Sequence, residues 1–332
     1  MIKFRVYMPD SRNGFDSLGR RPRNKPISTG KRITPQARDL LWFEKLREHG
    51  PLSATFLHEF SKKDRCSRKR ALDRMTDLFN EDRTPDGGRY LHRPYQQFDT
   101  MDSRYKELVY ANLESAEKAL KRFERWEEYT AANSGPWRHQ FMVSTITASI
   151  ELATRERQDI NFIPQHLILE RAETDLRFPT LIYPDLSKQG REVDLIPDAL
   201  FGLEYVDGSK KAYRFFLVEA DRGTEPSKAS CFNRKSHLRN FLQYREYIGQ
   251  KLYKSHLNLT AGLLVLHVTK DQSTLRRMMD LGSDLFEKGN TYMLFQSAEA
   301  FAGNFAPPKP TKQFLEKPWQ RIGFEDFRID QA

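Results

Sequence analysis

Short apolar runs in the second half of the chain predict alternating strands and helices. We expect strands at 162–171, 191–206, 211–221, 259–268 and 291–296. Helical spacing of apolar residues predicts helices at 137–156, 227–248 and 272–288. The Asp-Gly pair within 207–210 favours a tight turn, so the second and third strands should form a hairpin. This order of elements predicts a mixed α/β layer.

The first third of the chain follows helical spacing. Thr34-Pro35 is a favourable helix start, and it precedes an apolar stripe formed by Leu40, Leu41, Phe43 and Leu46. Two further helices are expected at 51–60 and 67–81, and the inward face of the later one should consist of Leu72, Met75, Leu78 and Phe79. Residues 83–98 contain a Gly-Gly pair and aromatic residues, which predicts a hairpin of two short strands with a Gly-Gly turn. Three helices and a hairpin are typical of a winged helix, a unit that binds DNA or another protein.

These elements divide the chain into five segments. Residues 1–33 are basic and rich in turn residues, and we expect a flexible arm that either contacts DNA or stays solvated. The winged helix should span 34–99, a helical connector 100–136, the α/β domain 137–305 and an extended Pro-rich tail 306–332. The predicted fold class is therefore α+β, with the winged helix preceding the α/β domain.

Positive charge is concentrated in the N-terminal third. The net charge is +10, and residues 1–99 contain 22 Lys and Arg against 13 Asp and Glu, whereas residues 100–332 contain 33 against 32. This asymmetry favours DNA as a polyanionic partner over a role in solubility alone. The candidate DNA contacts on the third helix and the hairpin are Arg68, Lys69, Arg70, Arg74 and Arg89.

The composition argues against several other classes of protein. No window approaches the roughly 18 apolar residues of a membrane span, and the N-terminus lacks the apolar segment of a signal peptide. The two cysteines, Cys66 and Cys231, are too few for a disulfide framework or a four-ligand zinc site. We therefore expect a cytoplasmic protein.

Carboxylates gather at the end of the predicted hairpin. Glu219 and Asp221 alternate in one strand, so both side chains should point to the same face. Counting from the turn places Asp198 opposite Glu219, with Asp194 on the same face. Carboxylates this close repel one another unless a cation intervenes, and oxygen ligands suit Mg²⁺ or Mn²⁺. The sequence therefore predicts a metal site formed by Asp198, Glu219 and Asp221.

The motifs around these carboxylates resemble a nuclease superfamily. "IPDALF" followed by "FFLVEADRGTEP" is similar to the PD-(D/E)XK pattern, and helix, three strands, helix, strand is the order of its core. With the helices "HQFMVSTITASIEL" and "NRKSHLRNFLQY" and the N-terminal winged helix, residues of about 34 to 270 resemble the plasmid replication-relaxation family, which is related to MobC-type relaxases. The resemblance implies a restriction-endonuclease-like domain that nicks DNA at a metal centre.

The resemblance also implies roles for single residues. Asp198 and Glu219 would be metal ligands, while Asp221 stands where the nuclease pattern has a lysine. Lys235 is a candidate replacement for that lysine, with Lys228 and Arg234 as others. His139 matches a histidine of the family-like pattern, which implies a role near the phosphate or the metal; a structural cap or a surface position is the alternative.

Several other polar residues have two interpretations each. We expect Glu151 to be solvated, although it could face the site, and Glu225 to cap the helix that follows it. Arg222 either binds a phosphate or pairs with Asp194. Tyr244 and Tyr247 are DNA contacts, a nucleophile or, more commonly for such positions, core aromatics.

Three functions follow from these observations. The first is a site-specific DNA nickase or relaxase of a mobile element, with relaxosome or coupling proteins as further partners. The second is a DNA-binding accessory protein of replication or the relaxosome, whose nuclease fold is catalytically degenerate because Asp221 replaces the lysine. The third is a defence or toxin nuclease with the same site chemistry.

Overall fold

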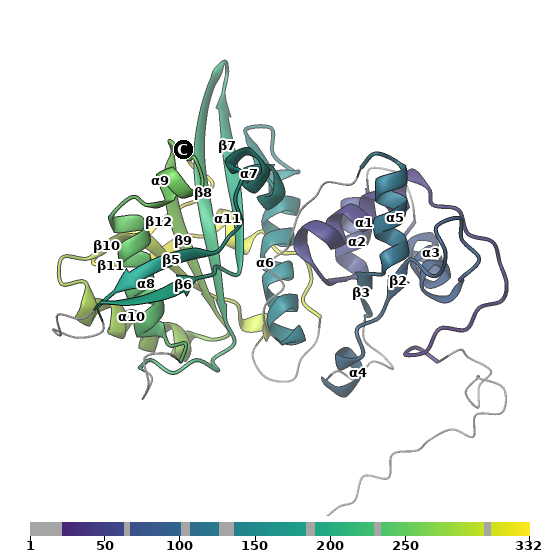
Figure 1. Ribbon diagram of the computed structural model, residues 1–332, viewed down its shortest axis with the longest axis horizontal. Coiled ribbons are helices and arrows are strands. Elements are labelled where there is room, and N and C mark those ends of the chain that lie inside the picture. The colour runs from purple at the N-terminus through teal and green to yellow at the C-terminus, as the bar shows by residue number, and fades with distance from the viewer. Residues whose placement is uncertain are drawn as a thin grey trace, which may run out of the picture.

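Two units of the protein lie on opposite sides of one long helix, α6 (Trp137–Thr154), in the computed structural model (Figure 1). The structure describes residues 22–62, 67–100, 107–125, 136–183, 190–228, 234–301 and 307–332. A helical N-terminal unit lies on one side of α6, and a large sheet domain lies on the other. The chain is therefore a mixed α+β protein. No helix in the described ranges is long and apolar enough to cross a membrane.

The N-terminal unit packs helices against a small antiparallel sheet. Its helices are α1 (Ala37–His49), α2 (Ala54–Phe60), α3 (Arg68–Asn80), α4 (Gln96–Thr100) and α5 (Glu114–Arg122). The strands pair in the order β1 (Leu52–Ser53), β3 (Val109–Asn112) and β2 (Leu91–His92). Fully buried aromatic side chains, among them Trp42, Phe43 and Phe56, form its core.

The strand pairing of this unit differs from the predicted hairpin. Residues 83–86, directly before the Gly-Gly pair, form only a single bridge, between Arg83 and Arg32; instead β2 pairs with β3, which the prediction assigned to a connector at 100–136. The polar run 83–89 offers no apolar side chains that a strand could bury, whereas Val109 and Tyr110 are buried. Residues 107–125 are thus part of the N-terminal unit, and 101–106 and 126–135 lie outside the described residues.

The predicted arm and the inward face of α3 also need correction. Residues 22–33 dock beside the end of α3, because the Glu81 carboxylate accepts hydrogen bonds from the backbone N–H groups of Thr29 and Lys31. Ile33 is buried at the end of this segment, while residues 1–21 lie outside the described part of the chain. On α3, Met75, Leu78 and Phe79 face inward as predicted, whereas Leu72 is exposed.

A seven-stranded mixed sheet forms the large domain. Its strand order is β12-β11-β10-β9-β8-β7-β4, with β8, β9 and β10 parallel and the other neighbours antiparallel. The strands are β4 (Ile160–Ile163), β7 (Ala199–Asp207), β8 (Lys210–Asp221), β9 (Gly262–Thr269), β10 (Asn290–Ser297), β11 (Trp319–Ile322) and β12 (Phe324–Phe327). The central strands are apolar on both faces, as expected for a sheet covered on both sides.

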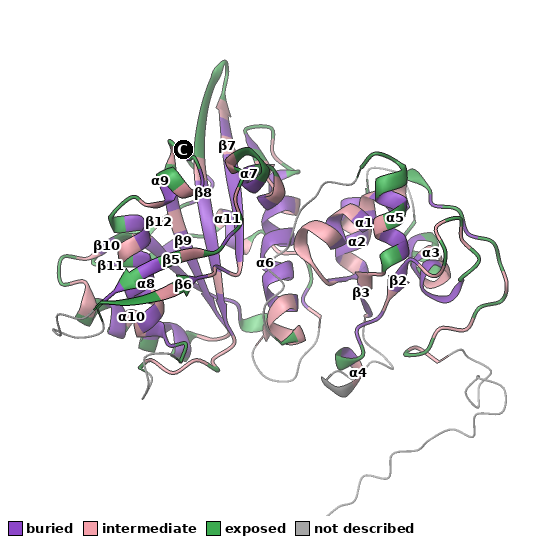
Figure 2. Ribbon diagram, viewed as in Figure 1, coloured by how far each residue is buried: buried purple, intermediate pink, exposed green. Residues whose placement is uncertain are grey.

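Helices cover both faces of this sheet. α6 and α11 (Gln313–Glu316) pack on one face. The other face packs against α7 (Gln165–Ala172), α8 (His237–Gly249) and α10 (Gln272–Leu285). A separate hairpin of β5 (Phe178–Ile182) and β6 (Arg191–Leu195) packs on α8, and the short elements α9 (Tyr253–His256) and η2 (Glu299–Phe301) complete the domain. Figure 2 shows the sheet and α6 largely buried.

Three predicted elements of this domain were wrong. The segment 162–171 is the end of β4 followed by α7, because Pro164 stands between them. The segment 191–206 is two strands in two different sheets, and Pro197, which has no N–H to donate, lies at the break. The predicted tail at 306–332 contains β11 and β12 at the sheet edge, where Trp319 and Ile329 are fully buried.

Candidate active site

The β7–β8 hairpin brings Asp198 beside Glu219. Asp207 pairs with Lys210 across the tight turn, and Ala199 pairs with Val218 at the other end. The backbone N–H of Asp198 donates to the carbonyl of Val218 at 3.1 Å, which continues the ladder by one residue. The register predicted from the Asp-Gly turn is therefore confirmed.

The Asp198 carboxylate is held by two donors. Its Oδ1 lies 2.9 Å from Nε2 of His139, in the first turn of α6, and its Oδ2 accepts the backbone N–H of Ala220 at 2.8 Å. Burial alone would lower the pKa of His139, but the hydrogen bond and the charge of Asp198 raise it above its ordinary value. The imidazole is thereby favoured in its charged form beside the carboxylate.

Glu219 lies beside a second carboxylate at this edge of the sheet. Burial, followed by repulsion from Asp198, raises the pKa of its carboxyl well above the usual range, while the charge of Lys235 opposes the rise. Tyr244 of α8 donates a short hydrogen bond to its Oε1. Burial also raises the pKa of the Tyr244 phenol well above its ordinary value, so this hydroxyl stays protonated and can only donate to the carboxylate.

Asp221 has a different environment from the other two carboxylates. Its Oδ1 accepts the backbone N–H groups of Gly223 at 2.7 Å and Thr224 at 3.3 Å, and its Oδ2 lies 3.3 Å from Nε2 of His237. Gly223 has a φ of +75°, which this tight turn requires. Burial alone would raise the pKa of Asp221, but His237 and the turn amides lower it. Asp221 therefore shapes the turn after β8.

A cavity of about 570 Å³ opens beside Glu219. The charged side chains that line it are Glu192, Asp194, Glu219, Glu225, Lys235 and Arg239. Lys235 reaches the cavity from the loop before α8, whereas Lys228 and Arg234 are exposed and do not line it. Of the three cations proposed to replace the missing lysine, Lys235 is the one beside Glu219.

Residues 43–263 match the replication-relaxation family, about two thirds of the chain. The chain belongs to the replication-relaxation family. No curated protein and no solved structure matches it. The resemblance seen in the sequence is thus confirmed at the level of the family.

Asp198 and Glu219 are the residues of this site that could hold a divalent cation. Their donors are carboxylate oxygens, each with lone pairs beyond those that accept the bonds above, and a cation would relieve the repulsion that raises the Glu219 pKa. The three carboxylates Asp198, Glu219 and Asp221 do not place three ligand atoms within 4.8 Å of one another among the described residues. The two-carboxylate set fits Mg²⁺ or Mn²⁺, and Asp221 does not complete it.

The structure contradicts two interpretations of neighbouring residues. Asp194 pairs with Arg177 at 2.8 Å rather than with Arg222. Glu225 does not cap α8, whose N-cap is Ser236, but lines the cavity with a pKa raised by burial.

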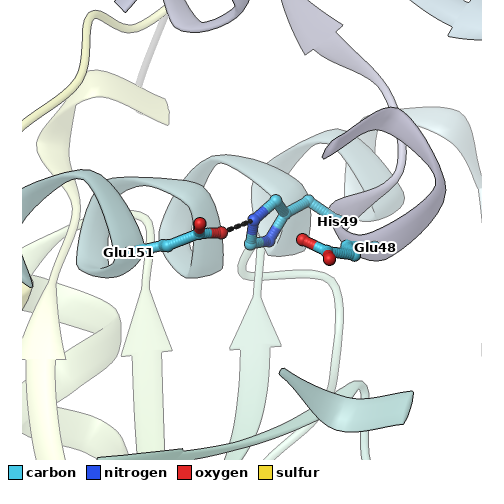
Figure 3. Close-up of side chains that lie close together, drawn as sticks. All are labelled: Glu48, His49 and Glu151. Atoms are coloured by element: carbon cyan, nitrogen blue, oxygen red, sulfur yellow. Dashed lines mark hydrogen bonds and ion pairs between the residues drawn. The ribbon is translucent and has the colours of Figure 1, made fainter. Parts of the chain in front are cut away.

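A second cluster joins the far end of α6 to the N-terminal unit (Figure 3). Glu48, His49 and Glu151 place one ligand atom each within 4.8 Å of one another, and His49 Nε2 lies 2.7 Å from Glu151 Oε2. Lys45 forms ion pairs with both glutamates, and Arg155 lies 2.7 Å from Glu151. These side chains already supply the positive charge that a metal would bring.

The sequence reading missed this cluster. Glu151 was expected to be solvated, yet its side chain is only 6% exposed. Its partners Lys45 and His49 lie about a hundred positions earlier, so no local pattern connects them. The small polar residues Ser144 and Thr147, which share a face of α6 with Glu151 and both contact His49, were the available signal.

The predicted DNA contacts on α3 fall into two groups. Lys69 and Arg70 are exposed at the start of the helix, and Arg68 is 60% exposed while approaching Thr55 and Glu107. Arg74 instead pairs with the fully buried Asp39 at 2.6 Å and donates to the carbonyl of Thr34, so it does not point outward as predicted. Arg89, after the Gly-Gly pair, is half-buried.

Proposed function

We propose that this replication-relaxation protein is a site-specific, metal-dependent DNA nickase or relaxase of a mobile element. In this proposal the N-terminal unit is a winged helix that selects the DNA site, and the sheet domain is a PD-(D/E)XK nuclease-like domain that cleaves one strand. The observation that carries the proposal is the position of Lys235, which lines the cavity beside Glu219; in this proposal it would take the part of the lysine that Asp221 replaces.

Each residue of the candidate site has a defined part in this proposal. Asp198 and Glu219 would hold Mg²⁺ or Mn²⁺, which when bound lowers the pKa of a water ligand and neutralises charge on the scissile phosphate. Lys235 would stabilise the negative charge that develops on the phosphoryl oxygens. His139 would hold Asp198 in place through the bond at 2.9 Å, and Asp221 would fix the turn after β8.

The N-terminal unit would supply most of the affinity for DNA. Arg68, Lys69 and Arg70 lie in the first turn of α3, the part of such a helix that reaches base edges in the major groove. Arg89 would contact the DNA backbone, whereas Arg74 is committed to Asp39. Relaxosome or coupling proteins remain candidate partners of the assembled complex.

Cleavage of supercoiled plasmid that carries the origin of the element tests this function. Wild-type protein with Mg²⁺ or Mn²⁺ should produce nicked circles, and Asp198→Asn, Glu219→Gln and Lys235→Met should each lower the rate by about 10²-fold or more. Lys210→Met, at the exposed tip of the hairpin, is the matched control and should cleave normally. Absence of nicking by the wild type, or normal nicking by Glu219→Gln, would contradict the proposal.

A DNA-binding accessory protein with a degenerate nuclease fold is the second candidate. It is favoured by Asp198, both of whose oxygens already accept protein hydrogen bonds. This candidate predicts site-specific binding in gel-shift assays without metal. It also predicts that Asp198→Asn and Glu219→Gln support plasmid maintenance or transfer in cells as well as the wild type does.

A further inference from the structure

Glu219 is flanked by aromatic side chains on the face of the sheet that α8 covers. On the neighbouring strand β9, His267 is its register partner, and this imidazole is buried. The ring of Tyr244 meets His267 edge-on, with centroids 6.0 Å apart and planes at 85°. His267 in turn stacks on Phe295 at 5.0 Å. The Tyr244 ring is thus held by a packed aromatic layer beneath the candidate site.

The hydroxyl of Tyr244 has one partner among the described residues, Oε1 of Glu219. The Tyr244 side chain is completely buried, and it is not among the residues that line the cavity beside Glu219. A phosphate entering that cavity would meet Glu219 and Lys235 before it could reach the phenol. Tyr244 is therefore poorly placed to act as a nucleophile or to contact DNA, which are the two functional roles considered for it from the sequence.

We propose that Tyr244 is a positioning residue that fixes the Glu219 carboxylate, so that Oε1 is held by the phenol and Oε2 is presented to the cation. The inference rests on the proposed metal-dependent function. It adds to that function a residue that was not among the predicted metal ligands. Groups that orient a metal ligand from behind reduce the number of conformations the ligand must lose on binding, and their loss commonly weakens metal affinity by about 10- to 100-fold.

Tyr247, three residues later on α8, provides a matched control. It is also buried, and its hydroxyl bonds Nδ1 of His256 at 2.7 Å. Tyr247→Phe therefore removes the same atom from the same helix, but the lost hydrogen bond does not involve Glu219. A purely structural role of Tyr244 would make the two substitutions equivalent in their effect on metal binding.

The test is Mn²⁺ binding to the full chain at fixed pH, followed by the electron paramagnetic resonance signal of free Mn²⁺. Tyr244→Phe should weaken the affinity by about tenfold, while Tyr247→Phe stays within about twofold of the wild type. Glu219→Gln should abolish the site. Because the shorter side chain of Glu219→Asp cannot reach the phenol, adding Tyr244→Phe to that variant should change the affinity by less than about twofold.

Each outcome decides between this inference and the function on which it rests. If Glu219→Gln abolishes binding but Tyr244→Phe matches Tyr247→Phe, the positioning role is wrong and the metal site stands. The positioning role is also wrong if Tyr244→Phe weakens Mn²⁺ affinity by the same factor in the Glu219→Asp protein as in the wild type. If the wild type binds no Mn²⁺, or Glu219→Gln binds it normally, the proposed function fails and the inference fails with it.

Discussion

The two ends of α6 each join a histidine to a carboxylate, but the charges around these pairs differ. His139 meets Asp198 near the start of the helix, and His49 meets Glu151 near its end, about 18 Å away along the axis. Lys45 and Arg155 also pair with Glu151. Burial alone would raise the pKa of Glu151, but its hydrogen bond with His49 and the charges of Lys45 and Arg155 lower it far below the usual range.

At the start of α6, the neighbour of the His139–Asp198 pair is a second carboxylate, that of Glu219, and not additional cations. Burial and the charge of Asp198 raise the pKa of Glu219, and Lys235, whose charge opposes this rise, is exposed along the cavity. The comparison teaches that a histidine–carboxylate pair alone does not identify a functional site. Excess negative charge beside a cavity identifies such a site better, because holding like charges close together costs free energy unless a bound ligand neutralises them.

The largest effect on stability should come from the balanced cluster. Glu151→Gln removes the partner charge of His49 and leaves Lys45 with Glu48 alone, so the free energy of unfolding measured in urea should fall by about 3–5 kcal/mol. Because the pKa of Glu151 is lowered in the folded state, its stabilisation is complete above the unfolded value near 4.5 and is lost as the pH falls below it. The difference between the two proteins should therefore shrink as the pH falls below about 4.5.

Glu156→Gln is the control for this prediction. Glu156 lies just beyond the same end of α6 and pairs with Lys312, but it is 62% exposed, so its loss should change stability by less than about 0.5 kcal/mol. A decrease of less than about 1 kcal/mol for Glu151→Gln would contradict the account of the cluster.

An intermediate effect on stability is expected at Asp221. Substitutions of this residue distinguish a role in shaping the turn from a role in binding the metal. Asp221→Ala removes the acceptor of two turn amides and the partner of His237, and should destabilise the fold by about 1–3 kcal/mol. Mn²⁺ affinity at Asp221→Asn should stay within about threefold of the wild type, since this carboxylate is not a ligand in our account. Loss of Mn²⁺ binding in a folded Asp221→Asn protein would restore the three-carboxylate site.

The smallest effect, of opposite sign, is expected at Glu219. Glu219→Gln removes a strained charge and should stabilise the protein by about 1 kcal/mol at pH 7, as substitutions at functional sites can. Because the Glu219 pKa is raised, the gain should appear only as the pH rises above the unfolded value near 4.5. Thermal unfolding at pH 4 and pH 7 checks this.

Glu204→Gln on β7 is the comparison for this gain. Lys211, Asn161 and Tyr213 lower the pKa of Glu204 to about 2, so its charge is not strained. The substitution should not stabilise the protein. If Glu219→Gln is destabilising at pH 7 to the same extent as Glu204→Gln, the two ends of α6 are not electrostatically different in the way proposed.

The local part of the candidate site followed from the sequence. Tight-turn chemistry at Asp207-Gly208 and strand alternation fixed the register, and the register alone places Asp198 beside Glu219. Asp221 obeys the same alternation, but its carboxylate folds back to the turn amides after β8. The spacing of residues does not show whether a carboxylate will contribute to the site or accept hydrogen bonds from a neighbouring turn.

The long-range part of the fold did not follow from the sequence. The pairing of β3 with β1 and β2, the docking of 22–33 on α3 and the addition of β11 to β10 all join segments with no shared local pattern. The contact of His49 with Glu151 spans 102 positions. Such contacts depend on the relative placement of whole elements, which propensity and periodicity do not specify.

Anomalous diffraction from a crystal of the protein soaked in Mn²⁺ tests the central claim most directly, because it compares both ends of α6 in one map. We predict a manganese peak between Asp198 and Glu219, and no peak at the Glu48–His49–Glu151 cluster, where Lys45 already supplies the positive charge. A peak at that cluster, or none beside Glu219, would contradict the account.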